Sequence, residues 1–258
     1  MTRHVEFEGI ENFRDYGGYA TAGGARLRNG LLYRSGHHAR ASDADLEKLK
    51  ALGLSRIVDL RRPNERARDP SRRWDGFDAQ VIDSDTEQEH SVEWLEFLAG
   101  SDLTIPSFRQ YMLTYYRGAP TDPRYVELYR RYFQVLADGD GPVLVHCAAG
   151  KDRTGVICAL THHMAGVHPD DVVEDYLLTN NPARIAARVE TVSQLIFEST
   201  GRRPTEAAVR YAIGVDAEFL AEAFAAMRER HGSIDGYLDQ VLGLEPALRA
   251  RIHDRLLA

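Results

Sequence analysis

The stretch VLVHCAAGKDRTGV, residues 143–156, is the part of the sequence that most strongly predicts a local fold. Residues 143–145 are apolar and follow Gly141 and Pro142, which predicts the start of a short buried strand. Residues 153–160 predict the beginning of a helix, and the small residues between the two segments predict a tight loop. Such a loop directs backbone N–H groups into one concavity, and a concavity of this kind at a helix N-terminus binds anions.

Further strands are expected on the N-terminal side of this unit. Residues 30–35 and 55–60 have the composition of short strands, and residues 81–82 predict a weaker one. Asp59 lies near the C-terminal end of the second of these strands. Ligands of open α/β sheets bind at that end of the strands, so Asp59 becomes a candidate for the same site.

Helices are expected between and after the strands. Ser42 followed by Asp45 forms a capping-box pattern, and Gly53 is expected to end the helix that starts there. Apolar spacing predicts the remaining helices in three segments, residues 125–136, residues 170–178 and two or three helices within 182–230. The arginine-rich residues 61–73 are expected to form a loop. This order predicts an α/β sheet with a helical C-terminal part.

Composition and length exclude several classes of protein. The 258 residues are 43% hydrophobic, which is enough to bury a full core, and the net charge of −7 argues against a nucleic-acid-binding protein. No apolar run approaches the roughly 20 residues that span a bilayer, so stable membrane insertion is not expected. No signal peptide is visible, which predicts a cytoplasmic protein and leaves export without a leader open. The sequence does not indicate an oligomeric state.

Neither a metal nor a cofactor is expected. The histidine pairs at 37–38 and 162–163 are adjacent in sequence, and no acidic or cysteine residue stands at metal-ligand spacing from them. Cys147 and Cys158 do not form a disulfide framework or a CxxC motif. Cys158 lies beside apolar residues and is expected in the core, with a role as an oxidation partner of Cys147 as the alternative.

Cys147 and Arg153 together predict phosphoryl transfer. Inward-pointing amides of residues 148–153, the helix N-terminus and a permanent cation favour a thiolate, which is the nucleophilic form of cysteine. The same groups suit a phosphate dianion, because a guanidinium binds two oxygens in bidentate fashion. Thiolate and phosphate then share one site, and the expected reaction passes through a phosphocysteine.

The segment from His146 to Gly155 resembles the signature of the protein-tyrosine-phosphatase superfamily, a His-Cys pair and an Arg-Thr-Gly separated by five residues. The longer form HCAAGKDRTG is similar to a bacterial branch of atypical tyrosine and lipid phosphatases with the loop HCxxGKDRTG. Other segments resemble that branch, namely NFRDYGG at 12–18, LYRS at 32–35, IVDLRRPNE at 57–65, DYLLTN at 175–180 and RHGSIDGYLDQVLGL at 230–244. The resemblance implies a single phosphatase domain over 1–258, with a small, mostly parallel sheet flanked by helices.

The resemblance also implies a role for each residue of the signature. Cys147 would be the nucleophile, Arg153 the phosphate clamp, and Thr154 the donor of a hydrogen bond to the sulfur. His146 would hold the shape of the loop, and Lys151 would add charge at its rim. The expected substrate-binding residues are His146, Ala148, Ala149, Gly150, Lys151, Asp152 and Arg153.

The general acid has more than one candidate. The Trp-Pro-Asp sequence of familiar tyrosine phosphatases is missing, and Trp74 with Asp75 is a poor match because Gly76 follows. Asp152, inside the loop, is favoured because the bacterial branch is thought to use that position. Asp59 is the second candidate, either as an acid and base or as an orienting partner for the loop.

The expected enzyme is a cysteine-dependent phosphatase that acts on phosphotyrosine, with phosphoserine, phosphothreonine and phosphoinositides left open. Its partners would be a phosphorylated protein or a phospholipid substrate. A catalytically silent phosphate-binding module is the alternative from another class, and a sulfur-transfer enzyme is a third.

The helices within 181–230 allow two interpretations. Their apolar residues exceed what the core of a small sheet needs, so these helices could form a lid over the pocket, and the bacterial relatives are similar in placing helices there. The other interpretation is that they extend the core.

Overall fold

Five strands form one sheet in the computed structural model, which describes residues 3–86 and 94–258. Their spatial order is β1-β2-β5-β3-β4. β1 is antiparallel to β2, whereas β2, β5, β3 and β4 run parallel. The strands are β1 (Arg14–Asp15), β2 (Leu32–Ser35), β3 (Arg56–Asp59), β4 (Gln80–Ile82) and β5 (Val143–His146). The three strands expected in the N-terminal half and the strand of the opening motif are therefore present.

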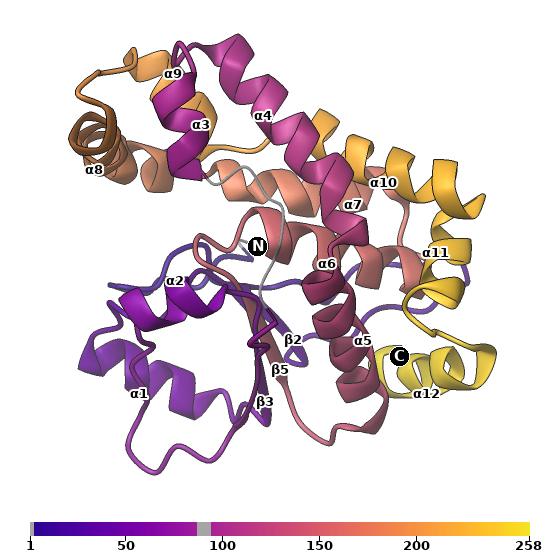
Figure 1. Cartoon of the computed structure of the whole chain (residues 1–258). Helices are drawn as coiled ribbons and strands as arrows, with labels where there is room; N and C mark the ends of the chain where they lie inside the picture. The colour runs from indigo at the N-terminus through magenta and orange to yellow at the C-terminus, as the bar shows by residue number, and fades with distance from the viewer. Residues whose placement is uncertain (1–2, 87–93) are drawn as a thin grey trace.

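Helices cover both faces of this sheet (Figure 1). One side carries α1 (Asp43–Ala51) and α2 (Pro63–Arg68), and on the other side α5 (Pro123–Asp138) and α6 (Asp152–Ala165) pack against the strands, with most of the remaining helices beside or behind them. The other helices on this second side are α4 (Ile105–Gly118), α7 (Pro169–Leu177), α10 (Ala217–His231), α11 (Ile234–Gln240) and α12 (Pro246–Leu256). Three further helices of the described chain lie beyond the strand ends, namely α3 (Trp94–Gly100), α8 (Pro182–Thr200) and α9 (Glu206–Ile213). The α/β fold with a mostly parallel sheet is thus confirmed.

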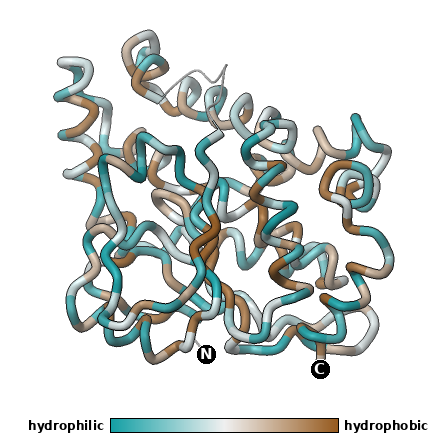
Figure 2. The backbone as a smooth tube through the Cα atoms, turned by 60° about the horizontal axis from the view of Figure 1, so that its bottom comes forward, coloured by the Kyte–Doolittle hydropathy of each residue, from teal (hydrophilic) through white to brown (hydrophobic). Residues whose placement is uncertain are grey.

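β5 lies at the centre of the sheet, and all four of its side chains are buried there. Val143 and Val145 belong to the large core under α5 and α6, while Leu144 belongs to the smaller core under α1. This alternation follows from the two-residue period of a strand. Figure 2 shows that hydrophobic residues are concentrated at the centre of the molecule, where the strands lie.

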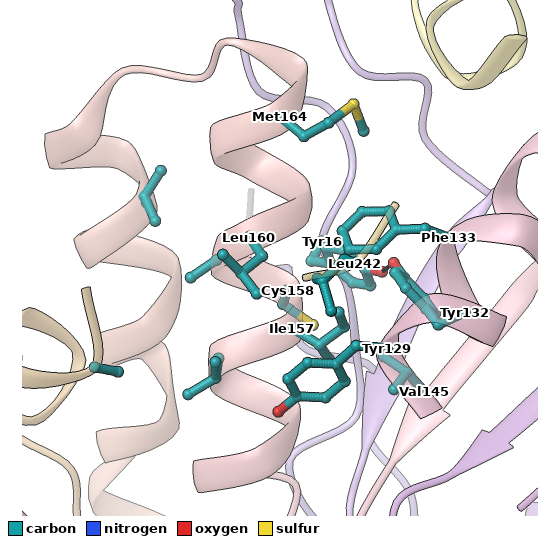
Figure 3. Close-up of a cluster of buried hydrophobic side chains, with 14 of the residues drawn as sticks. Tyr16, Tyr129, Tyr132, Phe133, Val145, Ile157, Cys158, Leu160, Met164 and Leu242 are labelled. Atoms are coloured by element: carbon teal, nitrogen blue, oxygen red, sulfur yellow. Dashed lines mark hydrogen bonds between the residues drawn. The ribbon is translucent and has the colours of Figure 1, made fainter. Parts of the chain in front are cut away.

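The large core joins α6 to α5 and the sheet (Figure 3). Ile157, Cys158 and Leu160 of α6 are each completely buried there. Burial raises the pKa of the Cys158 thiol to about 12, so this thiol stays protonated at neutral pH. The expectation that Cys158 is a core residue is confirmed.

The helix predicted from Ser42 begins there for the predicted reason. The Ser42 hydroxyl accepts a hydrogen bond from the Asp45 N–H, and the Asp45 carboxylate accepts one from the Ser42 N–H. The Asp45 carboxylate also accepts from the N–H groups of Glu8 and Gly9. The N-terminal segment is thereby attached to α1.

Residues 61–73 are not wholly a loop, which corrects the sequence-based expectation. α2 forms within them because Pro63 occupies its first turn and the Glu65 carboxylate accepts a 2.7 Å hydrogen bond from the Arg62 N–H. The segments that form α3 and α4 were not predicted as helices either.

The helices within 181–230 belong to two separate hydrophobic cores. Phe219, Leu220 and Met227 of α10 belong to the large core, so α10 extends it. The helices α3, α8 and α9 instead share a small separate core with α4, formed by Leu98, Leu103, Phe108, Ile196 and Ala208. Within the described part of the chain, no helix is both long enough and apolar enough to cross a membrane.

Candidate active site

Three parallel strands end side by side where the candidate site lies. Ser35 of β2 and Asp59 of β3 both pair in register with His146, the last residue of β5. Cys147 follows directly, with 2% of its surface exposed. The fold therefore places the expected nucleophile at the C-terminal edge of the sheet, where α/β proteins bind ligands.

The loop 147–153 curls between β5 and α6. Gly150 adopts a left-handed conformation with φ of 66°, and α6 begins at Asp152. The backbone N–H groups of residues 148–151 donate to no other group in residues 3–86 and 94–258. Ala149, Lys151, Asp152 and Arg153 line a cavity. The loop therefore has the form of an anion-binding cradle at a helix N-terminus.

Arg153 is held by Glu65, a residue that the sequence analysis did not single out. Nη2 of Arg153 donates a 2.8 Å hydrogen bond to Oε1 of Glu65, and Nη1 donates to Oε2. Nη1 also donates to the Leu60 carbonyl at 3.2 Å. Burial opposes ionisation of Glu65, but the Arg153 charge prevails and lowers the pKa of this carboxyl to about 2. Pro63 in the first turn and Glu65 three residues after Arg62 are a sequence signal that could have indicated α2, the helix that carries Glu65.

Asp152 lies in the first turn of α6 and lines the cavity. The Tyr116 hydroxyl donates a 2.8 Å hydrogen bond to its Oδ1, and the hydroxyls of Tyr116 and Tyr176 are 2.6 Å apart. Nζ of Lys151 is 3.9 Å from Oδ2. The carboxyl therefore has a fixed position at the cavity wall.

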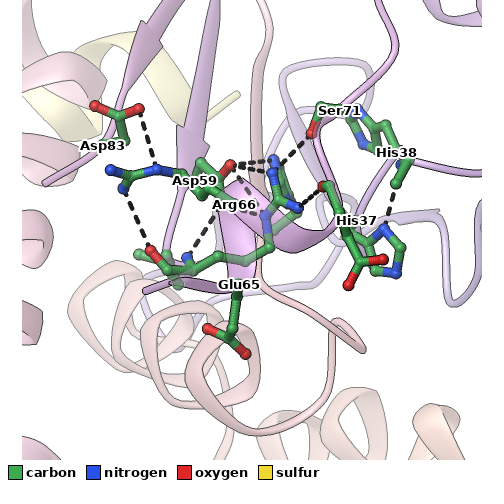
Figure 4. Close-up of polar contacts among 12 residues, drawn as sticks. His37, His38, Asp59, Glu65, Arg66, Ser71 and Asp83 are labelled. Atoms are coloured by element: carbon green, nitrogen blue, oxygen red, sulfur yellow. Dashed lines mark hydrogen bonds and ion pairs between the residues drawn. The ribbon is translucent and has the colours of Figure 1, made fainter. Parts of the chain in front are cut away.

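Asp59 is held differently and does not line the cavity. Its Oδ2 is 2.7 Å from Nη2 of Arg61, and its side chain is 2% exposed. Figure 4 shows Asp59 within a network of polar contacts that also contains His37, Ser71 and Glu65. Burial raises the pKa of this carboxyl, but His146 and Arg61 outweigh that effect and hold it well below its usual range. An ionised carboxylate has no proton to donate, so this geometry suits the orienting role rather than that of the general acid.

His146 and Thr154 are both fully buried. The His146 ring stacks on His38 at 4.7 Å between centroids, and its Nε2 is 3.7 Å from Oδ2 of Asp59. Burial lowers the pKa of His146 to about 4. The Thr154 hydroxyl has no hydrogen-bond partner in the part of the chain that the structure describes, so the expected bond to the Cys147 sulfur is not formed.

Lys151, expected to add charge at the rim of the loop, lines the cavity but is buried. Only 8% of its surface is exposed, and its ammonium donates to the carbonyls of Ala212 at 2.6 Å and Gly214 at 3.0 Å. These carbonyls end α9, where the helix dipole favours a cation. The reason for the difference is tertiary, because α9 covers this side of the loop.

The cavity has a volume of about 490 Å³ and combines charged with apolar walls. Its charged lining residues are Arg62, Glu65, Arg68, Lys151, Asp152, Arg153, Arg184 and Arg188. Its larger aromatic and aliphatic lining residues are Trp94, Leu95, Tyr111, Met112, Tyr115, Tyr125, Val192, Leu195 and Ile213. Basic residues outnumber acidic ones in this wall although the whole chain is acidic, so the cavity is suited to an anionic ligand with an apolar part.

A family model described as the tyrosine phosphatase family matches residues 5–258 of this sequence. The chain belongs to that family. It is 34% identical to the triple specificity protein phosphatase PtpB of Mycobacterium tuberculosis, over 98% of this chain and 98% of that protein. A Cupriavidus necator protein named as a tyrosine-protein phosphatase is also 34% identical, over 95% of this chain and 86% of that protein. A tyrosine-protein phosphatase of Nostoc commune is 28% identical over 81% of this chain and 68% of its own length.

This tyrosine phosphatase is thus an enzyme of the class that the signature predicted, a phosphatase of bacterial type. The family match extends over both the sheet and the C-terminal helices. Its candidate active site consists of loop 147–153, Glu65 and the aromatic wall of the cavity.

Proposed function

We propose that this phosphatase hydrolyses phosphotyrosine through a phosphocysteine on Cys147. The thiolate forms an S–P bond as the bond between phosphorus and the ester oxygen breaks, and Asp152 gives its proton to the leaving oxygen. Asp152 then takes a proton from water, the oxygen of that water attacks phosphorus, and the S–P bond breaks. The observation that carries this proposal is the position of Cys147 at the start of the loop that runs from the end of β5 to the N-terminus of α6.

Glu65 prepares Arg153 for this reaction. The carboxylate takes one N–H from each of the two Nη atoms, and the Leu60 carbonyl takes a second one from Nη1. Nε and the remaining N–H of Nη2 lie on the other edge of the guanidinium. Two parallel donors on one edge match two oxygens of a phosphoryl group, and they gain strength as negative charge develops in the transition state.

The walls of the cavity support an aromatic phosphoester. Trp94, Tyr111 and Tyr115 provide aromatic surface near Arg153, against which a phosphotyrosine ring can pack. Arg184 and Arg188 add positive charge on the α8 side. This charge favours substrates with further acidic groups, so we include phosphoinositides as secondary substrates. We also include phosphoserine and phosphothreonine, because the name of the Mycobacterium tuberculosis relative gives it more than one specificity.

We further propose that α3, α8 and α9 form a cover over the cavity within a single domain. Their small core is separate from the large one, and α8 buries only Ile196 completely along its length. A cover would shield the thiolate from oxidants. Since the reaction needs a reduced thiol, we place the enzyme at work in a reducing compartment such as the cytoplasm.

The test is a substrate panel on purified protein. Phosphotyrosine, phosphothreonine and phosphoinositide substrates are compared by phosphate release, and the Asp152→Asn variant is analysed by mass spectrometry after rapid acid quenching. We expect the fastest turnover with phosphotyrosine and a phosphoryl group on Cys147. Tight binding of phosphopeptide without any phosphate release would instead establish a silent binding module.

A further inference from the structure

Three short motifs that take no part in the reaction meet behind the loop 147–153. Asn12 and Arg14 come from the segment 12–18, Arg34 comes from β2, and Asp175 comes from α7. Arg14 and Arg34 are 0% exposed, Asp175 is 1% exposed and Asn12 is 6% exposed. A buried group of this polarity is costly unless its members pair with one another, so its position next to the loop requires an explanation.

The loop itself provides the partner. The Gly150 carbonyl accepts one hydrogen bond from Nδ2 of Asn12 at 2.7 Å and another from Nη2 of Arg34 at 3.0 Å. In a trans peptide the C=O and the following N–H point in opposite directions. Because the Gly150 carbonyl is held toward the buried network, the Lys151 N–H is turned away from it, toward the cavity.

A second peptide of the loop is fixed in the same manner. The His37 N–H donates a 3.0 Å hydrogen bond to the Ala148 carbonyl, which turns the Ala149 N–H to the opposite side. Gly150 also packs closely against the end of β2, since a Cβ atom there would lie 2.4 Å from the Ser35 carbonyl carbon. The loop thus rests on residues 35–37 and has no room to rotate its peptides.

Asp175 determines which way the donors point. It accepts from Nε of Arg14 at 3.2 Å and from Nη1 of Arg34 at 2.9 Å. Nη1 of Arg14 in turn donates to Oδ1 of Asn12 at 2.6 Å, so the amide nitrogen of Asn12 has to face Gly150. Two guanidinium groups share one carboxylate, and the positive charge in excess lies directly behind the anion site.

We propose that Asn12 and Arg34 are positioning residues of the catalytic loop, which act by holding the Gly150 carbonyl so that the Lys151 N–H binds the phosphoryl group. Arg14 and Asp175 orient these two residues. The inference rests on the proposed phosphate-binding role of the loop, but it does not depend on the identity of the general acid or of the substrate. It explains why segments 12–18, 32–35 and 175–180, far apart in sequence, contribute to one structure.

The test measures binding of orthovanadate and inorganic phosphate by titration calorimetry, which separates the dissociation constant from the fraction of competent protein. Arg34→Lys keeps the charge but replaces the two Nη atoms that donate to Asp175 and Gly150 by a single ammonium nitrogen. Asn12→Asp replaces the donor by an acceptor, and Asn12→Gly removes the side chain while accommodating the φ of 56° at this position. We expect the dissociation constant for both anions to rise about tenfold in each variant, with a stoichiometry close to that of the parent.

The matched control is Arg255→Lys. Arg255 also donates to backbone carbonyls, those of Val135, Leu136 and Gly141, but these lie toward the opposite end of β5 from Cys147. We expect this variant to lose stability and to keep the parent's anion affinity. A purely structural role for Asn12 and Arg34 would lower the stoichiometry or the melting temperature and leave the dissociation constants unchanged, and that result would overturn the proposal. Loss of turnover in Cys147→Ser tests the proposed function separately.

Discussion

Tyr116 donates a hydrogen bond to the Asp152 carboxyl, which joins the C-terminal half of α4 to the first turn of α6. The Tyr116 hydroxyl is itself 2.6 Å from that of Tyr176. Both tyrosine rings are buried, and burial is the main cause that raises the pKa of each hydroxyl well above its ordinary value. The two phenols therefore stay protonated and provide a rigid support on one side of Asp152.

Asp152→Asn should slow the hydrolysis of phosphotyrosine by about 10²–10⁴-fold, the usual contribution of a general acid. A general acid matters most when the leaving group is poor, so an activated aryl phosphate should lose much less. The basic limb of the pH profile should flatten as well. If Asp59→Asn shows this pattern and Asp152→Asn does not, the assignment of the two carboxyls is reversed.

Tyr116→Phe should produce the same pattern with a smaller loss, about tenfold, because the carboxyl remains but loses its support. Tyr132→Phe is the matched control, since Tyr132 pairs with the Tyr16 hydroxyl in the large core. The Tyr132→Phe control should lower the stability of the fold and leave the rate of hydrolysis unchanged. Equal effects of the two substitutions on leaving-group dependence would argue against a support role for Tyr116.

Cys147→Ser should abolish turnover and leave the fold and phosphate affinity largely intact, because a serine hydroxyl fills the same space but stays protonated. Arg153→Lys should also be severely impaired, since a lysine cannot hold Glu65 with one edge and phosphate with another. Phosphate release and calorimetric phosphate binding measure the two effects. Normal turnover in Cys147→Ser would disprove the phosphocysteine mechanism.

Glu65→Gln should reduce kcat/KM by about tenfold to a hundredfold, because a neutral amide offers only one acceptor to the two Nη atoms of Arg153. Steady-state kinetics and the melting temperature are compared with those of Glu47→Gln, at an exposed position of α1. The control should match the parent in both. Unchanged kinetics in Glu65→Gln would show that Arg153 does not need this partner.

Acid should destabilise the fold through His146. Its pKa is lowered by burial from 6.5 to about 4, so between these values the unfolded chain binds a proton that the folded chain does not. Stability therefore falls as the pH drops below 6.5, by about 2 kcal/mol from this residue between pH 7 and pH 5. Urea unfolding of His146→Asn should show a correspondingly smaller loss, whereas His168→Asn, at an exposed position, should behave as the parent.

The cover can be detected by hydrogen exchange with and without vanadate. We expect amides in α8 and α9 to exchange faster than those of β5 and to slow when vanadate binds, because these helices share only a small core with α3. Amides of α10 are the internal reference, since this helix belongs to the large core. Uniform protection in both states would mean that α8 and α9 extend the core.

Much of the site follows from the sequence because it is local. The strand, loop and helix of residues 143–165 depend on side chains within a few positions of one another, and so does the helix that Ser42 and Asp45 begin. Local hydrogen bonds and residue periodicity have the same form in any fold. The strand, the loop and the helix that carry the candidate nucleophile could be predicted for that reason, and the signature in this loop predicted the class of enzyme.

What only the tertiary structure decided is how distant segments act on this loop. Glu65 reaches Arg153 from α2, and the Lys151 ammonium donates to the carbonyls at the end of α9. Each of these pairings joins charges to whichever partner the packing brings near, and in a buried site an unpaired charge is too costly to leave. A sequence shows which residues carry charge, but only the folded chain determines their partners.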